Sequence, residues 1–174
     1  EGLQVHVRDG RHAQHELQGQ VANAMQAAFS AMSSACEIGV VLQFMKGSFA
    51  LQDNAALQHS MLQALQELGL DASIQLRSLR GVSTVNAEGP CGQLEIGLIE
   101  TLARRGHIVD AGRVTVFSYG QVSLAVKNMP REDEERKGRL RDNLAFLTEG
   151  AAARLAALAA AWQQPQQAVV LAEL

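Results

Sequence analysis

Residues 113–147 pass directly from a strand pattern into a helix pattern, and this passage constrains the fold more than any other part of the sequence. Val122, Leu124 and Val126 alternate with small or polar residues, and a period of two is typical of a half-buried strand. Pro130 has no backbone N–H to donate to a sheet, so we expect the strand to end just before it. A charged run follows, and then leucines recur at helical spacing. We therefore expect the chain to leave its last strand through a long helix.

The N-terminal part of the chain, residues 1–35, is predicted to hold a long helix with two apolar stripes, because residues 11–35 combine many Ala and Gln with no proline. One stripe consists mostly of small residues at the 4-3 spacing of a coiled coil: Leu17, Val21, Ala24, Ala28, Ala31 and Ala35. The other stripe is bulkier: Met25, Phe29, Met32 and Cys36. A helix with two stripes packs on two sides. We assign the small-residue stripe to a partner helix and the bulky stripe to the chain's own domain, the alternative being one broad core face.

The middle of the chain, residues 36–150, is predicted to form one α+β domain. Apolar residues at helical spacing predict helices over residues 38–49 and 53–68, and Asp53 suits the N-cap of the second. A further helix is expected over residues 92–105. Alternating residues predict strands over residues 72–77, 82–85, 107–110, 113–119 and 121–127. The pattern indicates a five-stranded antiparallel sheet with helices on one face and long N- and C-terminal helices.

The helix that leaves the sheet is predicted to extend beyond the domain. Its first turn is acidic, which suits a helix N-terminus. Gly138 lies inside this helix and suggests close approach by another element, and Pro165 is expected to end the helix. We expect residues 151–174 to form a helical extension and tail. The apolar stripe of this helix is predicted to complete a parallel dimer interface through four residues: Leu147, Ala151, Leu155 and Leu158.

Composition excludes several classes of function. The net charge of −3 gives no general attraction to nucleic acid, and few aromatic residues are present to stack on bases. No apolar run approaches the roughly 20 residues of a membrane span, so we expect no membrane contact. Two cysteines are too few for a disulfide framework, which favours a cytoplasmic protein. Because the chain begins with Glu1, we expect it to be part of a longer protein.

Several stretches resemble a GAF-related domain of bacterial two-component response regulators, which lies beside a receiver domain. The most specific are GQVSLAVKNMP (residues 120–130) and GRLRDNLAFLTEGAAAR (138–154). Weaker matches are AMSSACEIGVVLQF (31–44), LGLDASIQLR (68–77) and GPCGQLE (89–95). The resemblance implies a GAF/PAS-like fold and a cytoplasmic signalling module that is usually a homodimer, relays a signal between neighbouring domains, and has no enzymatic activity.

The sequence names no cofactor. Lys127-Asn128 differs from the Asn-Lys signature of cyclic-nucleotide types, and Cys91 is followed by Gly92 rather than by the His of bilin-binding types. No catalytic or metal-binding motif is present. Three alternatives to a purely regulatory domain remain. One is a small-molecule sensor with a pocket between sheet and helix, for which Phe117 and Tyr119 are weak candidates. The others use Cys91, either as a redox sensor, since a helix N-terminus can lower a thiol pKa, or as the reactive residue of an enzyme.

Overall fold

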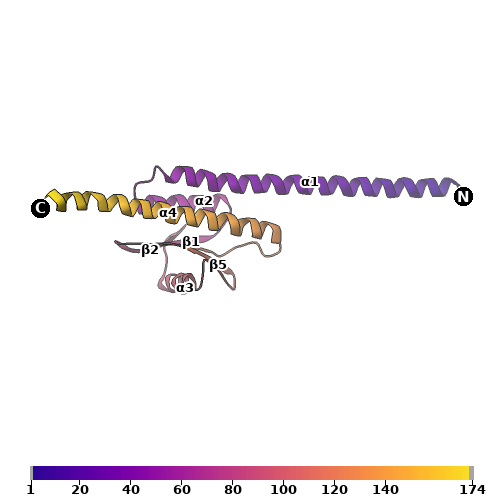
Figure 1. Cartoon of the computed structure of the whole chain (residues 1–174). Helices are drawn as coiled ribbons and strands as arrows, with labels where there is room; N and C mark the ends of the chain where they lie inside the picture. Colours follow the sequence, from indigo (N-terminus) through magenta and orange to yellow (C-terminus); the bar gives the residue numbers. More distant parts are fainter. Residues whose placement is uncertain (1, 173–174) are drawn as a thin grey trace. The chain divides into compact units, whose positions relative to one another are not determined.

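The computed structural model describes the backbone of residues 2–172 and the side chains of residues 7–163 and of Ala172. These residues form four helices and six strands (Figure 1). In chain order the elements are α1 (Gly2–Ser48), α2 (Asn54–Glu67), β1 (Ala72–Ser78), β2 (Gly81–Asn86), β3 (Gly89–Pro90), α3 (Gln93–Ala103), β4 (Ile108–Ala111), β5 (Val114–Tyr119), β6 (Val122–Val126) and α4 (Glu134–Ala172).

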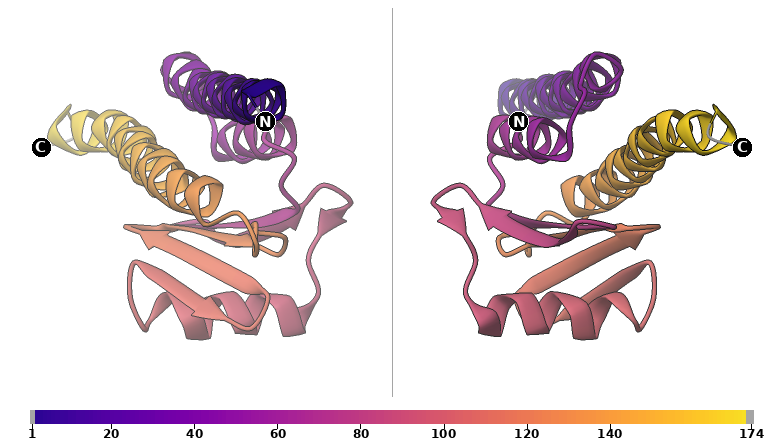
Figure 2. Two further views of the ribbon diagram at one scale, coloured as in Figure 1. Left: turned by 90° about the vertical axis from the view of Figure 1, so that its right-hand side faces the viewer. Right: turned by 90° about the vertical axis from the view of Figure 1, so that its left-hand side faces the viewer.

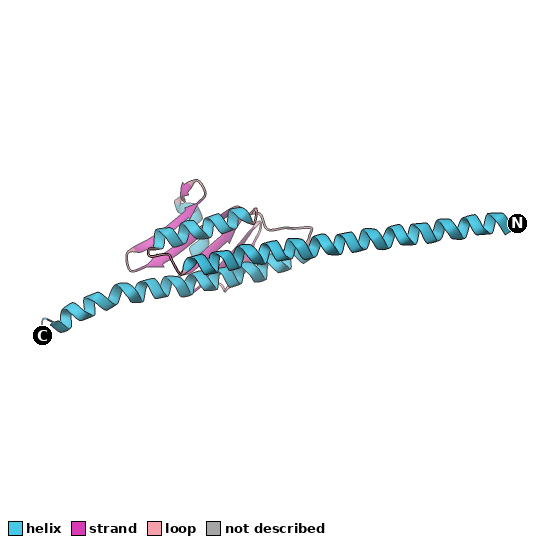
Figure 3. Cartoon of the chain, turned by 90° about the horizontal axis from the view of Figure 1, so that it is seen from above, coloured by secondary structure: helices cyan, strands magenta, loops and turns pink. Residues whose placement is uncertain are grey.

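The chain divides into two compact units, residues 1–36 and residues 37–174. The first unit is helical wherever the structure describes it and belongs to α1, which continues without a break to Ser48. The second unit contains the sheet and every other element. Figure 3 shows both long helices, α1 and α4, as continuous ribbons.

All neighbouring strands of the sheet are antiparallel, in the order β3-β2-β1-β6-β5-β4. The predicted α+β class with long terminal helices is confirmed. Two details differ. The short strand β3 adds a sixth strand, and helices cover both faces of the sheet rather than one. Figure 2 shows α2 and α4 on one face and α3 on the other. Helix α3 packs there because Ile99 and Leu102 are buried against Val116 and Ala125.

The larger core lies between the sheet and helices α1, α2 and α4. Alternation along β1 turns Ile74 and Leu76 towards this core and Ser73, Gln75 and Arg77 towards α3, because successive side chains of a strand point to opposite faces. Asp53 caps α2 by accepting a hydrogen bond from the backbone N–H of Ala56 at 2.7 Å. The cap and the core residues of α2 together hold that helix on the sheet.

Helix α4 continues through Pro165 to Ala172, so the prediction that this proline ends the helix is wrong. A proline inside a helix removes one backbone hydrogen bond and strains the preceding turn, yet the neighbouring Gln and Ala residues favour helix. Leu174 lies outside the described residues. The predicted boundary at residue 150 falls inside α4, whose next turns still pack in the core.

The close approach between α4 and another helix occurs at Gly150 rather than at Gly138. A Cβ added to Gly138 would meet nothing within 4 Å, so no other element of this chain approaches that glycine, and approach by a partner helix stays a prediction. A Cβ added to Gly150 would lie 2.2 Å from Cε of Met45 in α1. Because Gly150 has no side chain, the end of the Met45 side chain can pack directly against the backbone of α4 at this position. The cost in helix propensity is the same for both glycines, and only packing distinguishes them.

Candidate functional site

The predicted partner-facing stripe of α1 is exposed along the first unit. Leu17 is 60 % exposed and Val21 56 %, and Ala24, Ala28 and Ala31 are exposed as well. No charged residue occurs from residue 17 to residue 36. A helix stripe of this length that is apolar and uncharged is unusual for a side that faces water.

The bulky stripe of α1 is also exposed, which corrects its assignment to the chain's own domain. Phe29 and Met32 are each 65 % exposed, and Met25 is exposed too. The residues of α1 that do pack on the second unit lie further along the helix, at Val41 and Phe44. Val41 and Phe44 do not continue the 4-3 spacing of the bulky stripe, so these two core residues lie on a different face of the helix.

The four residues of α4 that were predicted to face a second copy instead lie in the chain's own core: Leu147, Ala151, Leu155 and Leu158, all at most 5 % exposed. Their helical spacing is the same for either partner, and burying each leucine against the sheet contributes roughly 1.5–3 kcal/mol. Their side chains are therefore not available to a partner helix, and only the α1 half of the predicted interface lies on the surface.

A belt of hydrogen-bonded polar side chains crosses four strands on the sheet face that α3 covers. The guanidinium of Arg77 donates to Oε1 of Gln75 at 2.8 Å and to Oγ of Ser123 at 3.0 Å. Gln75 in turn donates to Oγ1 of Thr84 at 3.0 Å, and the hydroxyls of Ser118 and Ser123 are 3.0 Å apart. Burial holds the pKa of Arg77 below its usual value, and the charge of Glu100 opposes that shift. The belt thus places a half-buried cation among neutral partners.

Cys91 lies beside an ionic cluster at the start of α3. Glu95 accepts hydrogen bonds from the Ser73 hydroxyl and from Nζ of Lys127, the latter at 2.7 Å. Burial raises the pKa of the Cys91 thiol; a hydrogen bond with Ser73 opposes this and the charge of Glu95 reinforces it. Burial and the charge of Glu95 thus oppose the lowering of the thiol pKa on which a redox role at a helix N-terminus depends.

The remaining cofactor candidates do not converge with Cys91. Phe117 is fully buried in the larger core, on the opposite side of the sheet from α3. The ring of Tyr119 stacks on His107 with 4.7 Å between the centroids. His107 also contacts the carbonyl oxygen of Ser118 through Nδ1 at 2.8 Å. Cys91 thus lies on the other face of the sheet from Phe117, whereas Phe117 and Tyr119, two residues apart in β5, share one face.

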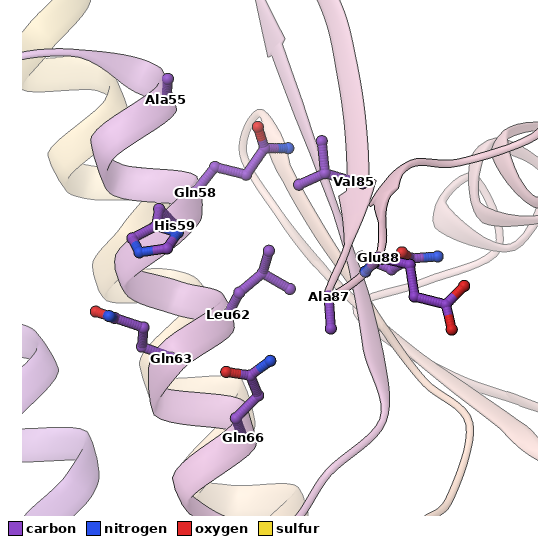
Figure 4. A pocket seen from close by; sticks show the side chains of 11 residues that line it. Ala55, Gln58, His59, Leu62, Gln63, Gln66, Val85, Ala87 and Glu88 are labelled. Carbon is purple, nitrogen blue, oxygen red and sulfur yellow. Dashed lines mark hydrogen bonds between the residues drawn. The ribbon is translucent and has the colours of Figure 1, made fainter.

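A shallow groove of 370 Å³ runs between α2 and the hairpin of β2 and β3. Figure 4 shows Gln58 and Leu62 of α2 pointing across it towards Val85 and Ala87. The buried amide of Gln58 donates to the carbonyl oxygens of Ile74 and Ser83 at 2.9 and 3.1 Å, so it is already satisfied by the protein. Among the described residues that line this groove, every buried side-chain nitrogen or oxygen has a hydrogen-bond partner within the protein.

Sequence reasoning missed a buried ion-pair cluster at the start of the second unit. Glu37 of α1 is 5 % exposed, and its two carboxylate oxygens accept from Nε of Arg136 at 3.1 Å and from Nε of Arg139 at 3.2 Å. Both arginines belong to the first turns of α4. The signal was present in the sequence, because Glu37 is the only charged residue between residues 17 and 45. Its partners, about a hundred positions away, could not be identified from spacing.

No group of three or more His, Cys, Asp or Glu side chains that could hold a metal ion occurs among the described residues. Residues 7–48 and 134–163 form helices long and apolar enough to cross a membrane by length and composition alone. Leu140, Leu144 and Leu147 of α4 pack in the core, and Glu37 of α1 is buried in an ion-pair cluster.

Comparisons with known proteins identify the fold. Neither the family models nor the curated proteins with which the sequence was compared gave a match. A solved structure that does match is the native GAF domain of the potassium sensor histidine kinase KdpD from Escherichia coli. The TM-score is 0.52 at 14 % sequence identity, over 71 % of this chain and 97 % of that chain. At this identity the likeness concerns the fold alone, and the fold of this chain is a GAF fold with long helices at both ends.

Proposed function

We propose that this chain is a non-enzymatic regulatory domain that pairs with a second copy through α1 and relays a signal between neighbouring domains. The observation that carries the proposal is the exposed, uncharged apolar surface of α1 from Leu17 to Cys36. A helix of this kind is stable in water when a partner covers its apolar stripe, and a parallel second copy presents the same 4-3 spacing. The long helix then connects the GAF-fold body to whatever precedes it.

The setting that we propose is a cytoplasmic response regulator with a flanking receiver domain. Support comes from the resemblance of residues 120–154 to such regulators and from two cysteines that are both free. No nucleic acid or membrane takes part in the proposed relay. A GAF fold is compatible with many functions, so the proposal depends on the α1 surface rather than on the fold.

Sedimentation equilibrium of the whole chain tests the pairing. We expect a dimer at micromolar concentration and a monomer when Val21 and Ala28 are both replaced by Glu, because two like charges per chain then meet in the interface. Gln26→Glu is the matched control, since Gln26 lies on the helix face away from the stripe. A wild-type chain that remains monomeric at high micromolar concentration contradicts the proposal.

The polar belt around Arg77 favours a second candidate function, the binding of a small anionic molecule. The hydrogen-bond partners of this half-buried guanidinium within the belt are neutral, so a negatively charged ligand would add to the attraction that the charge of Glu100 already supplies. A panel of small carboxylates and phosphates in a thermal-shift assay tests this idea. Stabilisation that grows with ligand concentration in the wild type and disappears in Arg77→Gln supports it. Equal responses of both proteins would exclude the belt as the binding site.

A further inference from the structure

The carboxylate of Glu37 stands at the point where the second unit begins. Unit one ends at Cys36, and Glu37 is the next residue of the same helix. Two arginines hold its two oxygens at 3.1 and 3.2 Å, and the side chain is almost completely buried. A buried carboxylate is costly without such partners, so the position of Glu37 is strongly tied to the start of α4.

The same arginines connect this point to other elements of the domain. Arg136 also donates to the carbonyl oxygen of Leu68, just after the end of α2, at 3.4 Å. Its backbone N–H donates to Oδ1 of Asp133 at 2.9 Å, which caps the first turn of α4. Arg139 additionally pairs with the exposed Glu135 of its own helix at 3.1 Å. The beginning of α4 is thus fixed by α1, by α2 and by its own cap.

A short connection leads from this cluster back to the α3 face of the sheet. Lys127 follows strand β6 and pairs with Glu95 of α3 at 2.7 Å. The next residue, Asn128, accepts from the backbone N–H of Asp71 at 2.7 Å and donates to the carbonyl oxygen of Gly69 at 3.1 Å. Only residues 129–133 separate this anchored segment from α4. A displacement of α3 can therefore be transmitted to Glu37 through the ion pair of Glu95 and Lys127, the connecting residues 128–133 and Arg136 at the start of α4.

We propose that Glu37, Arg136 and Arg139 form a latch that fastens the domain-side part of α1 to the start of α4. The latch is the point at which a change at the α3 face of the sheet reaches α1. This inference rests on the proposed relay function and assigns it a physical device. The two states are latched, with Glu37 held by both arginines, and released, with residues 38–48 of α1 more weakly held by their apolar contacts alone.

Amide hydrogen exchange of the whole chain, resolved over residues 38–48, tests the latch. Glu37→Gln keeps the shape of the side chain and removes its charge. We expect exchange over residues 38–48 to rise by about tenfold or more, with α2 and β1 unchanged. The matched control is Glu135→Gln, which removes an exposed carboxylate from the same Arg139 and is expected to change exchange by about threefold at most. Equal effects of the two variants would overturn the latch.

A mutant cycle tests the connection to α3. Glu95→Gln breaks the pair with Lys127 and is expected to change exchange over residues 38–48 by about threefold in the wild-type background. In the Glu37→Gln background it is expected to have no further effect there, because the latch is already released. Additive effects, or no effect of Glu95→Gln in either background, would overturn the relay through this cluster. Should Glu37→Gln fail to fold, Arg136→Gln, which removes the more exposed arginine, takes its place.

These exchange rates are measured within residues 37–174 and report on the latch whether or not two chains pair. The molecular mass of the same samples in sedimentation reports on pairing. A dimer whose exchange does not respond to Glu37→Gln contradicts the latch alone. A monomer whose exchange responds as expected contradicts the proposed pairing alone.

Discussion

The guanidinium of Arg80 lies 4.3 Å from the centroid of the Trp162 ring. Arg80 is in the turn between β1 and β2, and Trp162 is near the C-terminal end of α4, so this contact joins the tip of the hairpin to the long helix. Trp162 is the only tryptophan of the chain. Its fluorescence therefore reports on this one contact.

Removal of the contact changes that fluorescence. In Arg80→Ala we expect the emission of Trp162 to shift to longer wavelength, because water replaces the cation over the ring. The free energy of unfolding should fall by about 0.5–1 kcal/mol, as for other exposed cation–π pairs. Arg131→Ala is the control, since Arg131 is exposed and lies in the loop before α4. An emission spectrum that stays the same in Arg80→Ala would show that the contact is not formed in solution.

The two glycines of α4 should respond oppositely to alanine. Gly138→Ala places a methyl group in open space and should stabilise the chain by up to about 1 kcal/mol through helix propensity. Gly150→Ala forces Met45 to move and should destabilise the chain by about 1 kcal/mol, the low end for overpacking, because the end of a methionine is flexible. Urea unfolding of both variants measures these differences. If Gly150→Ala stabilises the chain as much as Gly138→Ala, α1 and α4 do not approach each other as described.

The two cysteines should differ in reactivity. Cys36 is exposed, whereas Cys91 is partly buried and its thiol has a raised pKa because of burial. Alkylation at neutral pH should therefore proceed in two phases, the slow one belonging to Cys91, since only the thiolate attacks. Cys36→Ser should remove the fast phase and Cys91→Ser the slow phase. Faster reaction of Cys91 would revive its redox role.

The pair of Glu95 and Lys127 should stabilise the chain in a defined pH range. Burial alone would raise the pKa of Glu95, but hydrogen bonds from Lys127 and Ser73 outweigh it and the pKa is lowered. A lowered carboxyl pKa adds stability above the unfolded value of about 4.3, and this stability is lost as pH falls through the folded value.

Glu95→Gln should therefore cost about 1 kcal/mol or less at pH 7, because the pair is partly exposed, and progressively less as the pH falls below about 4. Urea unfolding of both proteins at several pH values checks this. The pKa of Lys127 is raised by its hydrogen bond to Glu95, so its contribution is lost only at strongly alkaline pH. A loss of stability that is the same at pH 7 and pH 3 would contradict an ionic origin.

The sequence predicted the strands well where alternation was clear, as at Ile74 and Leu76 in β1 and at Val122 and Leu124 in β6. Strand β3 was missed because two residues, one of them Pro90, carry no alternation. The buried face of α4 was recognised from its spacing, but a period cannot tell whether Leu155 packs on its own sheet or on a second chain. That decision depends on tertiary contacts.

The candidate sites were predictable only in part. The exposed stripe of α1 follows from spacing and composition. The polar belt joins Arg77 to Ser123 across 46 residues, and the latch joins Glu37 to Arg139 across 102. Pairings over such distances depend on the sheet order, which no local pattern contains. Each strand of the belt contributes an ordinary polar residue that, by itself, is typical of a solvated sheet face.

Disulfide cross-linking at Ala28 tests the central claim, that a second copy covers the small-residue stripe of α1, most directly. In a Cys36→Ser and Cys91→Ser background, Ala28→Cys should form a covalent dimer under mild oxidation, because facing positions of a parallel pair bring two Cβ atoms within bonding reach. Gln26→Cys, on the opposite face of the same helix, should remain monomeric. Efficient cross-linking at Gln26, or none at Ala28, would contradict a pairing of two chains through this stripe.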